Sequence, residues 1–266
     1  MMWIYDLPNW SAGIIIVGVT TLVALGGHRL NHWLFRKKHV NHHEDLSKDV
    51  LAAVTLMLSL LIAFTAVAVW EAYSKAEDSL EREAAIAGEL SRDLAVMGSP
   101  EALATREALR SYLRMVVDLE WPSMALGKES VDTSHTFNQI FWRAGMIEAK
   151  TSRDEIILGE IWDRTNELNT VRRGRLDVLK SAVPSSLRAV LAIVILVSFF
   201  LFFMQPATRF NQFLLGAYAL TIGLIIFFII VMDRPFAGKE CLSAEPFEHA
   251  LQSMDRWDKE RPSGGK

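Results

Sequence analysis

Most of the architecture follows from residues 50–97, VLAAVTLMLSLLIAFTAVAVWEAYSKAEDSLEREAAIAGELSRDLAVM. Residues 50–70 contain no Asp, Glu, Lys or Arg, and at about 1.5 Å per residue they can cross a hydrocarbon core of about 30 Å. Residues 71–97 are charged but rich in Ala, Glu, Leu and Arg, which favour helix. Because residues 50–87 contain neither Pro nor Gly, the sequence predicts one unbroken helix from about residue 48 to residue 97.

Three further apolar stretches accompany this helix. Residues 11–27, 189–204 and 210–232 also lack Asp, Glu, Lys and Arg, and each can span most or all of a bilayer. The sequence therefore predicts an all-α polytopic membrane protein with four transmembrane helices and a helical extramembrane domain inserted between helices 2 and 3. The expected divisions are 1–70 for transmembrane helices 1 and 2 with a basic His-rich loop, 71–184 for the helical domain, 185–234 for transmembrane helices 3 and 4, and 235–266 for a C-terminal tail.

The helical domain carries recognisable helix boundaries. Ser99 before a proline predicts a capped helix start, and Pro122 predicts the end of that helix. Two more helices are expected, one over residues 134–148 and one over residues 152–180, the latter opened by a capping box at Ser152. No alternating strand pattern is found, so the domain should be wholly helical.

The composition narrows the classes of function. The net charge is −3, and the basic residues are interleaved with acidic ones, so no nucleic acid partner is expected. Cys241 is the only cysteine, which excludes an intrachain disulfide framework and a Cys-rich zinc site. The chain contains no Gly-rich phosphate loop, nucleophile elbow or His-Glu-x-x-His run, so the sequence predicts neither an enzyme nor a cofactor.

The distribution of Lys and Arg predicts an orientation, because basic residues beside short membrane loops are retained in the cytoplasm. The first loop carries Arg29, Arg36, Lys37, Lys38 and Lys48, whereas no Lys or Arg precedes Trp10. This loop is therefore predicted inside, and the helical domain and the C-terminal tail are predicted outside. Four basic residues before the third span favour the opposite orientation, namely Arg172, Arg173, Arg175 and Lys180.

Four sequence blocks carry a resemblance to a known family. They are WEAYSKAEDSLEREA at residues 70–84, EWP at 120–122, RRGRL at 172–176, and DRPF at 233–236 followed by Gly238. In this order the blocks resemble signatures of the bestrophin-like family of bacterial membrane proteins. The resemblance implies four membrane helices, a helical domain, and residence as a multi-pass protein of the bacterial cytoplasmic (inner) membrane.

The layout of that family is similar to that of bestrophins, which are pentameric anion channels. The resemblance thus implies a homo-oligomer in the lipid bilayer, with inorganic ions as possible partners. Neither the aromatic pore-neck sequence nor the acidic calcium-binding cluster of bestrophins is found in this chain. Channel activity therefore follows here from similarity of fold.

Several motif residues should lie at one membrane interface, because the second helix leaves the bilayer where the fourth helix ends. Glu71 and Arg234 are candidates to form an ion pair there, although headgroups could equally solvate both charges. Pro235 should end the fourth helix. The full set of interface residues is Trp70, Glu71, Tyr73, Asp233, Arg234, Pro235 and Phe236.

Small residues form a stripe along the second membrane helix. At 100° per residue, Ala52, Thr55, Ser59, Ala63 and Ala66 fall within about 80° of one another. Such a stripe permits close helix packing, and it could also line a narrow pore. The pore-lining candidates are Thr55, Ser59 and Ala66, because that face combines hydroxyl groups with small volume.

The first loop is rich in histidine. His28 and His32 are spaced i and i+4, so they share a helix face and could offer two imidazoles to a metal. A basic loop that binds anionic headgroups explains the same region, including His39, His42 and His43, without a metal. No metal site is predicted, and His28 and His32 are the only weak candidates.

Two functions remain after these exclusions. The first is a homo-oligomeric pore for ions, with anions favoured by the layout shared with bestrophins. The second is a non-conducting membrane scaffold or envelope sensor whose helical domain binds a partner. A continuous opening along an oligomer axis would favour the first, and a sealed bundle would favour the second.

Overall fold

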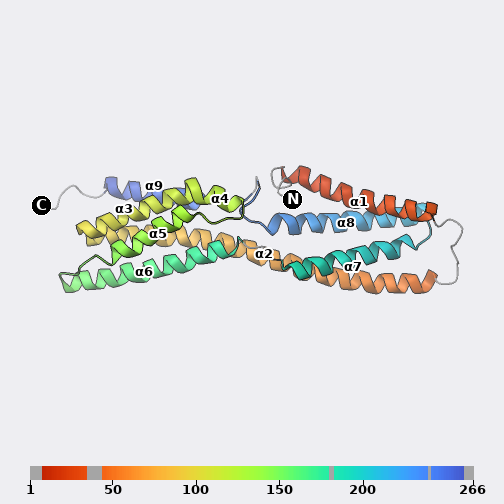
Figure 1. Ribbon diagram of the computed structural model, residues 1–266, viewed down its shortest axis with the longest axis horizontal. Helices are drawn as coiled ribbons and strands as arrows, with labels where there is room; N and C mark the ends of the chain where they lie inside the picture. The colour runs from red at the N-terminus through yellow and green to blue at the C-terminus, as the bar shows by residue number, and fades with distance from the viewer. Residues whose placement is uncertain (1–7, 35–43, 180–182, 239–240, 261–266) are drawn as a thin grey trace. The chain divides into compact units, whose positions relative to one another are not determined.

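The computed structural model describes residues 8–34, 44–179, 183–238 and 241–260, and over these residues the chain is helical with no strand (Figure 1). This confirms the all-α prediction. The helices are α1 (Asn9–Leu34), α2 (Glu44–Met97), α3 (Pro100–Met115), the π-helix η2 (Val116–Glu120), α4 (Trp121–Ala125), α5 (Val131–Ala144), α6 (Ser152–Asp177), α7 (Ser185–Phe203), α8 (Arg209–Met232) and α9 (Glu245–Glu260).

The chain divides into two compact units, and α2 contributes to both. The membrane unit comprises residues 1–73, 181–234 and 238–240. The central unit comprises residues 74–180, 235–237 and 241–266. The predicted unbroken second helix is present, since α2 runs from Glu44 to Met97.

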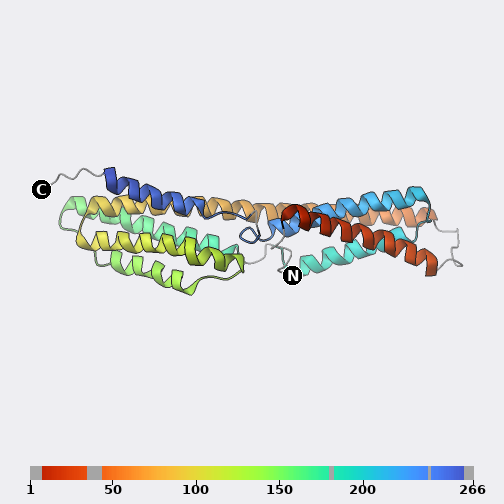
Figure 2. The same cartoon turned by 90° about the horizontal axis from the view of Figure 1, so that it is seen from above.

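The membrane unit contains the described helices that are long and apolar enough to cross a bilayer. They are Trp10–Leu34, Ser185–Phe203, Arg209–Met232 and, for its part up to Tyr73, the long helix Leu46–Met97. Leu58 and Ile62 of α2 pack against Leu191 of α7 and Ile222 of α8. Helix α1 runs along α8 in Figure 1 and crosses it in the view of Figure 2, and a Cβ at Gly223 of α8 would lie 3.0 Å from the Cα of Val17 in α1. The two helices approach closely because glycine occupies this position.

The central unit packs the second part of α2 with α3, η2, α4, α5, α6 and α9. Its core is apolar and contains fully buried Leu90, Leu109, Ile140 and Leu168. Ser99 caps α3 as predicted, since its side chain accepts a hydrogen bond from the backbone N–H of Ala102.

The prediction that Pro122 ends the helix begun at Ser99 is wrong. The chain passes from α3 through the π-helix η2 into α4, and Pro122 lies in the first turn of α4. A proline is tolerated there because the π-helix just before it already interrupts the i→i−4 hydrogen bonds that a proline would break. The neighbouring Trp121 N–H donates to the carbonyl of Val116, five residues earlier.

Two predicted helix starts shift by a few residues. Helix α5 begins at Val131 rather than at residue 134, and Ser130 caps it. Helix α6 has Thr151 as its cap, and Asp154 completes the capping box that the sequence placed one residue later. The predicted C-terminal tail contains α9, whose Phe247, Ala250 and Met254 are buried in the central unit.

Candidate functional site

A groove in the membrane unit lies between α2 and α8. Its volume is about 440 Å³, and apolar side chains line most of it. The lining residues are Leu58, Ser59, Ile62, Ala63, Ala66, Tyr218, Thr221, Ile222, Leu224, Ile225 and Phe228. The small side chains of Ser59, Ala63 and Ala66 follow one another along one face of α2, and they leave this space open.

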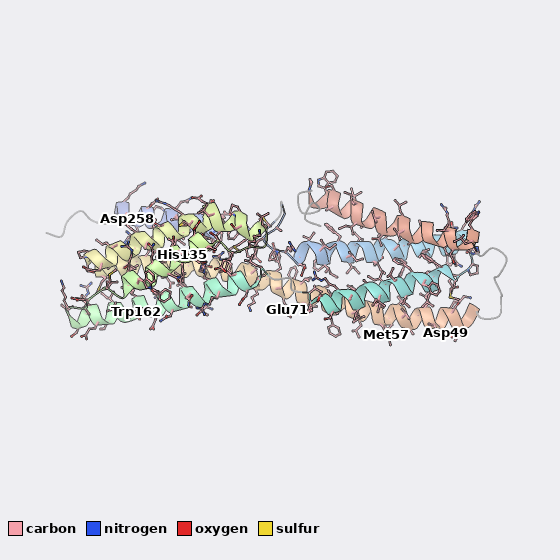
Figure 3. All side chains as sticks on the ribbon, viewed as in Figure 1. Asp49, Met57, Glu71, His135, Trp162 and Asp258 are labelled. Carbon is pink, nitrogen blue, oxygen red and sulfur yellow. The ribbon has the colours of Figure 1, made fainter. Side chains whose placement is uncertain are left out.

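Two of the three predicted pore residues share this groove. Ser59 and Ala66 line it, whereas Thr55 does not, although its carbonyl accepts a hydrogen bond of 2.8 Å from the Ser59 hydroxyl. At 100° per residue, the bulky exposed side chains of α2 fall on another arc of the helix, with Met57 67% and Phe64 65% exposed. Figure 3 labels Met57 on this helix. Helix α2 therefore presents two different accessible surfaces, one small and partly polar and one bulky and apolar.

Sequence reasoning missed the contribution of α8 to this groove. Tyr218 and Thr221 line it opposite α2. The Thr221 hydroxyl donates to the carbonyl of Ala217 at 3.0 Å, whereas the buried phenolic oxygen of Tyr218 has no hydrogen-bond partner in the described part of the chain. Polar residues within the apolar stretch 210–232 were the available signal, since membrane-embedded hydroxyl groups need partners.

The interface motif divides between the two units. In the membrane unit, Trp70 is 56% exposed, Glu71 is exposed, Tyr73 is half-buried, and the Asp233 carboxylate accepts a hydrogen bond of 3.2 Å from the Val183 N–H. The predicted pairing of Glu71 with Arg234 stays a prediction. Helix α8 ends at Met232, shortly before Pro235.

The remaining motif residues pack inside the central unit. Pro235 and Phe236 are buried, and the Phe236 ring meets the Trp121 ring edge to face at 5.4 Å between centroids. The Trp121 indole N–H donates to the carbonyl of Leu242 at 3.2 Å. These contacts anchor the chain after α8 onto the helices of the central unit.

A buried ionic network joins three of the four sequence blocks that carry the family resemblance. Arg175 of α6 donates to Glu83 of α2 and to Glu120 of η2, both at 2.7 Å. Arg172 donates to Glu120 at 2.8 Å, and the Tyr112 hydroxyl donates to Glu83. The side chains of Arg175, Glu83 and Glu120 are fully buried. We refer to these five residues as the ionic network.

The charged groups of the ionic network offset one another's cost of burial. Burial alone would lower the pKa of Arg175, but Glu83, Tyr112 and Glu120 raise it well above its ordinary value. Burial, reinforced by Glu83, raises the pKa of the Tyr112 hydroxyl well above its ordinary value, so this group stays a donor. Two guanidinium groups offset two carboxylates, which satisfies the requirement that buried charges be paired.

The two predicted metal candidates instead contact the connection between α7 and α8. His28 is buried, and its Nε2 lies 3.1 Å from the carbonyl oxygen of Gln205. His32 accepts a hydrogen bond of 3.0 Å at Nε2 from the Ala207 N–H. The Gln205 amide also donates to Ser47 of α2 at 3.0 Å. The two imidazoles thus help to hold three chain segments together at this end of the membrane unit.

Among the described residues, no group of three or more His, Cys, Asp or Glu side chains could hold a metal ion. The loop residues that the sequence associated with headgroup or metal binding lie outside the described residues. They are Arg36, Lys37, Lys38, His39, His42 and His43.

The sequence of this chain matches a known protein family over most of its length. Residues 18–247 match the model of the Bestrophin-like domain. The chain belongs to the bestrophin-like family. No curated protein matches this bestrophin-like chain.

Solved structures share its fold at low sequence identity. A crystal structure of a mutated bacterial bestrophin homologue from Klebsiella pneumoniae is 13% identical, with a TM-score of 0.67 over 91% of this chain and 98% of that chain. A second mutated form of the homologue is 10% identical, with a TM-score of 0.63 over 92% and 97% of the two chains. A structure of the homologue phased with zinc is 11% identical, with a TM-score of 0.63 over 94% and 99%.

Proposed function

We propose that this bestrophin-like protein is a homo-oligomeric ion channel of the bacterial inner membrane, with copies of α2 arranged around a common axis. The observation that carries the proposal is the accessible small and hydroxyl-bearing surface of α2 at Ser59, Ala63 and Ala66. Bulky apolar side chains suit lipid, whereas small side chains and hydroxyl groups suit close helix approach or a narrow aqueous path. Anions are the proposed cargo, because bestrophins share this layout.

The groove supplies polar groups at a depth where lipid offers none. Ser59, Tyr218 and Thr221 line it from two helices, and the phenolic oxygen of Tyr218 lacks a partner within the described residues. A hydroxyl group is costly in hydrocarbon, and ions or water beside the exposed Ser59 side chain within an assembled channel would lower that cost, whereas the Tyr218 oxygen itself is buried. This argument supports a hydrated surface near Ser59 in the oligomer.

Conductance of reconstituted protein tests the proposal. Ser59→Trp should abolish most of the current while leaving the size of the purified oligomer unchanged, because the bulky indole fills the narrow path. Leu60→Trp is the matched control, since Leu60 is 58% exposed on the bulky surface of the same helix. Equal currents from both variants, or no current from correctly assembled wild-type protein under any ion or voltage, would refute the channel.

The interface charges make a different contribution to the proposed assembly. Glu71→Ala or Arg234→Ala should loosen the oligomer rather than block conduction, because each strands a charge at the membrane interface. Size-exclusion chromatography with light scattering measures this effect. A fully assembled oligomer with unchanged thermal stability in both variants would contradict it.

A non-conducting scaffold or sensor is the second candidate, and one surface favours it. Trp142, Met146 and Ile156, around the turn between α5 and α6, are 74%, 59% and 71% exposed. Large exposed apolar side chains on both sides of one connection suit a protein-binding surface. Absence of current together with loss of a cellular partner on Trp142→Ser would support this function.

The proposed orientation places the central unit and α9 outside. Two of the four basic residues that favour the opposite orientation, Arg172 and Arg175, are buried and paired with Glu83 and Glu120. Pairing within the fold does not remove them as retention signals, because the rule counts Lys and Arg rather than net charge, so all four residues still favour the opposite orientation. Chemical labelling of Cys241 in intact cells tests the orientation.

A further inference from the structure

Helix α9 covers one side of the ionic network. The Cζ atom of Arg175 lies 5.5 Å from the centroid of the Phe247 ring, and the same ring lies 6.1 Å from the ring of Trp121. Phe247 is fully buried, and Ala250 and Met254 extend the buried face along α9. The apolar face of α9 thus forms part of the wall that keeps water from Arg175.

Charge holds the other end of α9. The two carboxylate oxygens of Asp258 lie 2.6 Å from Nη1 of Arg106 and 2.6 Å from Nη2 of Arg110, both on α3. Asp255 of α9 lies 3.4 Å from Arg110, and Glu107 of α3 lies 2.7 Å from the same guanidinium group. We refer to Asp258, Arg106 and Arg110 as the clamp, and Figure 3 marks Asp258 on α9.

The clamp is accessible to solvent from the side of α9. The side chain of Asp258 is 38% exposed, whereas those of Arg106 and Arg110 are 7% and 12% exposed. Ions in solution can therefore screen and compete with the carboxylate, while the two guanidinium groups stay largely covered. The hold on the C-terminal end of α9 should consequently weaken with salt, unlike the apolar contacts of Phe247.

We propose that α9 is a releasable strap: when the clamp opens, α9 lifts from α3 as one helix, Phe247 leaves the guanidinium group of Arg175 and water reaches the ionic network, while Phe236 keeps the preceding chain docked on Trp121. The strap acts within the central unit and does not depend on whether the protein conducts ions. It makes hydration of Arg175 respond to the ionic conditions around Asp258.

Amide hydrogen exchange of the full-length protein, followed by mass spectrometry, tests the strap. Asp258→Asn removes the charge but keeps the size, so exchange in α9 should rise about tenfold. The segment of α6 that carries Arg175 should exchange faster to a smaller degree, and α5 should not change. Glu248→Gln is the matched control, because Glu248 is an exposed carboxylate on the same helix.

Salt provides a second measurement. Raising the ionic strength from about 0.1 M to about 1 M shortens the screening length from about 10 Å to about 3 Å, so α9 exchange should rise in wild-type protein and stay constant in Asp258→Asn. Unchanged α9 exchange in the variant would overturn the strap. An equal rise across α3, α5 and α6 would also overturn it, because the clamp would then stabilise the whole unit.

Discussion

Replacing Arg175 by Met should open the central unit locally by a large and predictable amount. In the native unit, Arg175 neutralises Glu83 and Glu120, and all three side chains are fully buried. The substitution replaces the guanidinium group by an unbranched apolar side chain of similar length. It leaves the buried carboxylates of Glu83 and Glu120 without this partner. Removing one partner of a buried ion pair costs about 3–5 kcal/mol, which corresponds to more than about a hundredfold in the opening equilibrium.

Hydrogen exchange of amides in α6 and the second part of α2 measures this opening. Arg82→Met is the matched control, because Arg82 also joins α2 to α6 through an ion pair with Glu167, but its side chain is 65% exposed. Such an exposed pair contributes only about 0.2–1 kcal/mol. If Arg175→Met raised exchange no more than Arg82→Met, the reasoning about buried charge would be refuted. Adding Glu83→Gln to Arg175→Met should recover part of the loss.

Three further predictions concern other parts of the chain. A membrane-impermeant maleimide should label Cys241 in intact cells if the orientation is right, whereas labelling only after lysis, with a denatured control for burial, would reverse it. Burial alone would raise the pKa of Asp258, but hydrogen bonds from its arginine partners hold it below the ordinary 3.8. Its stabilising effect is therefore complete above that value and lost as pH falls through the lower folded-state pKa, so α9 exchange should rise only in strong acid. Gly223→Leu should lower the thermal midpoint by crowding Val17, whereas Gly18→Leu, with no neighbouring atom within 4 Å of an added Cβ, should not.

The parts of the fold that depend on local chemistry could be predicted from the sequence. The absence of Pro and Gly over residues 50–87 was enough to predict a continuous α2. Ser99 marks the start of α3, because its side chain accepts a hydrogen bond from the backbone N–H of Ala102, three residues later. Helix α9 could have been found too. Its Phe247, Ala250 and Met254 recur at helical spacing, which predicts an amphipathic helix where the sequence analysis places only a tail.

The ionic network could not be predicted in the same way, because its pairs are distant in sequence. Glu83 and Arg175 are each surrounded in sequence by other charged residues, and nothing local distinguishes them from solvated positions such as Arg82. Only packing of α2 against α6 brings them together. The groove is limited by long-range contacts in the same way. The small residues near Ser59 in the sequence were enough to identify Ser59, whereas Tyr218 lines the groove only because α8 packs against α2.

The π-helix η2 has a consequence for how this chain should be aligned with its relatives. A π turn accommodates one residue more than the α-helix on either side of it, so Val116–Glu120 holds an extra residue without rotating the helix that comes after it. A relative with an ordinary α-helix here would need a single-residue gap in this segment to keep its counterpart of Glu120 in phase. Deleting one residue elsewhere, for example within α6, would turn every later side chain of that helix by about 100°. Among the helical segments of the central unit, η2 is thus one where chain length can change by one residue at little cost.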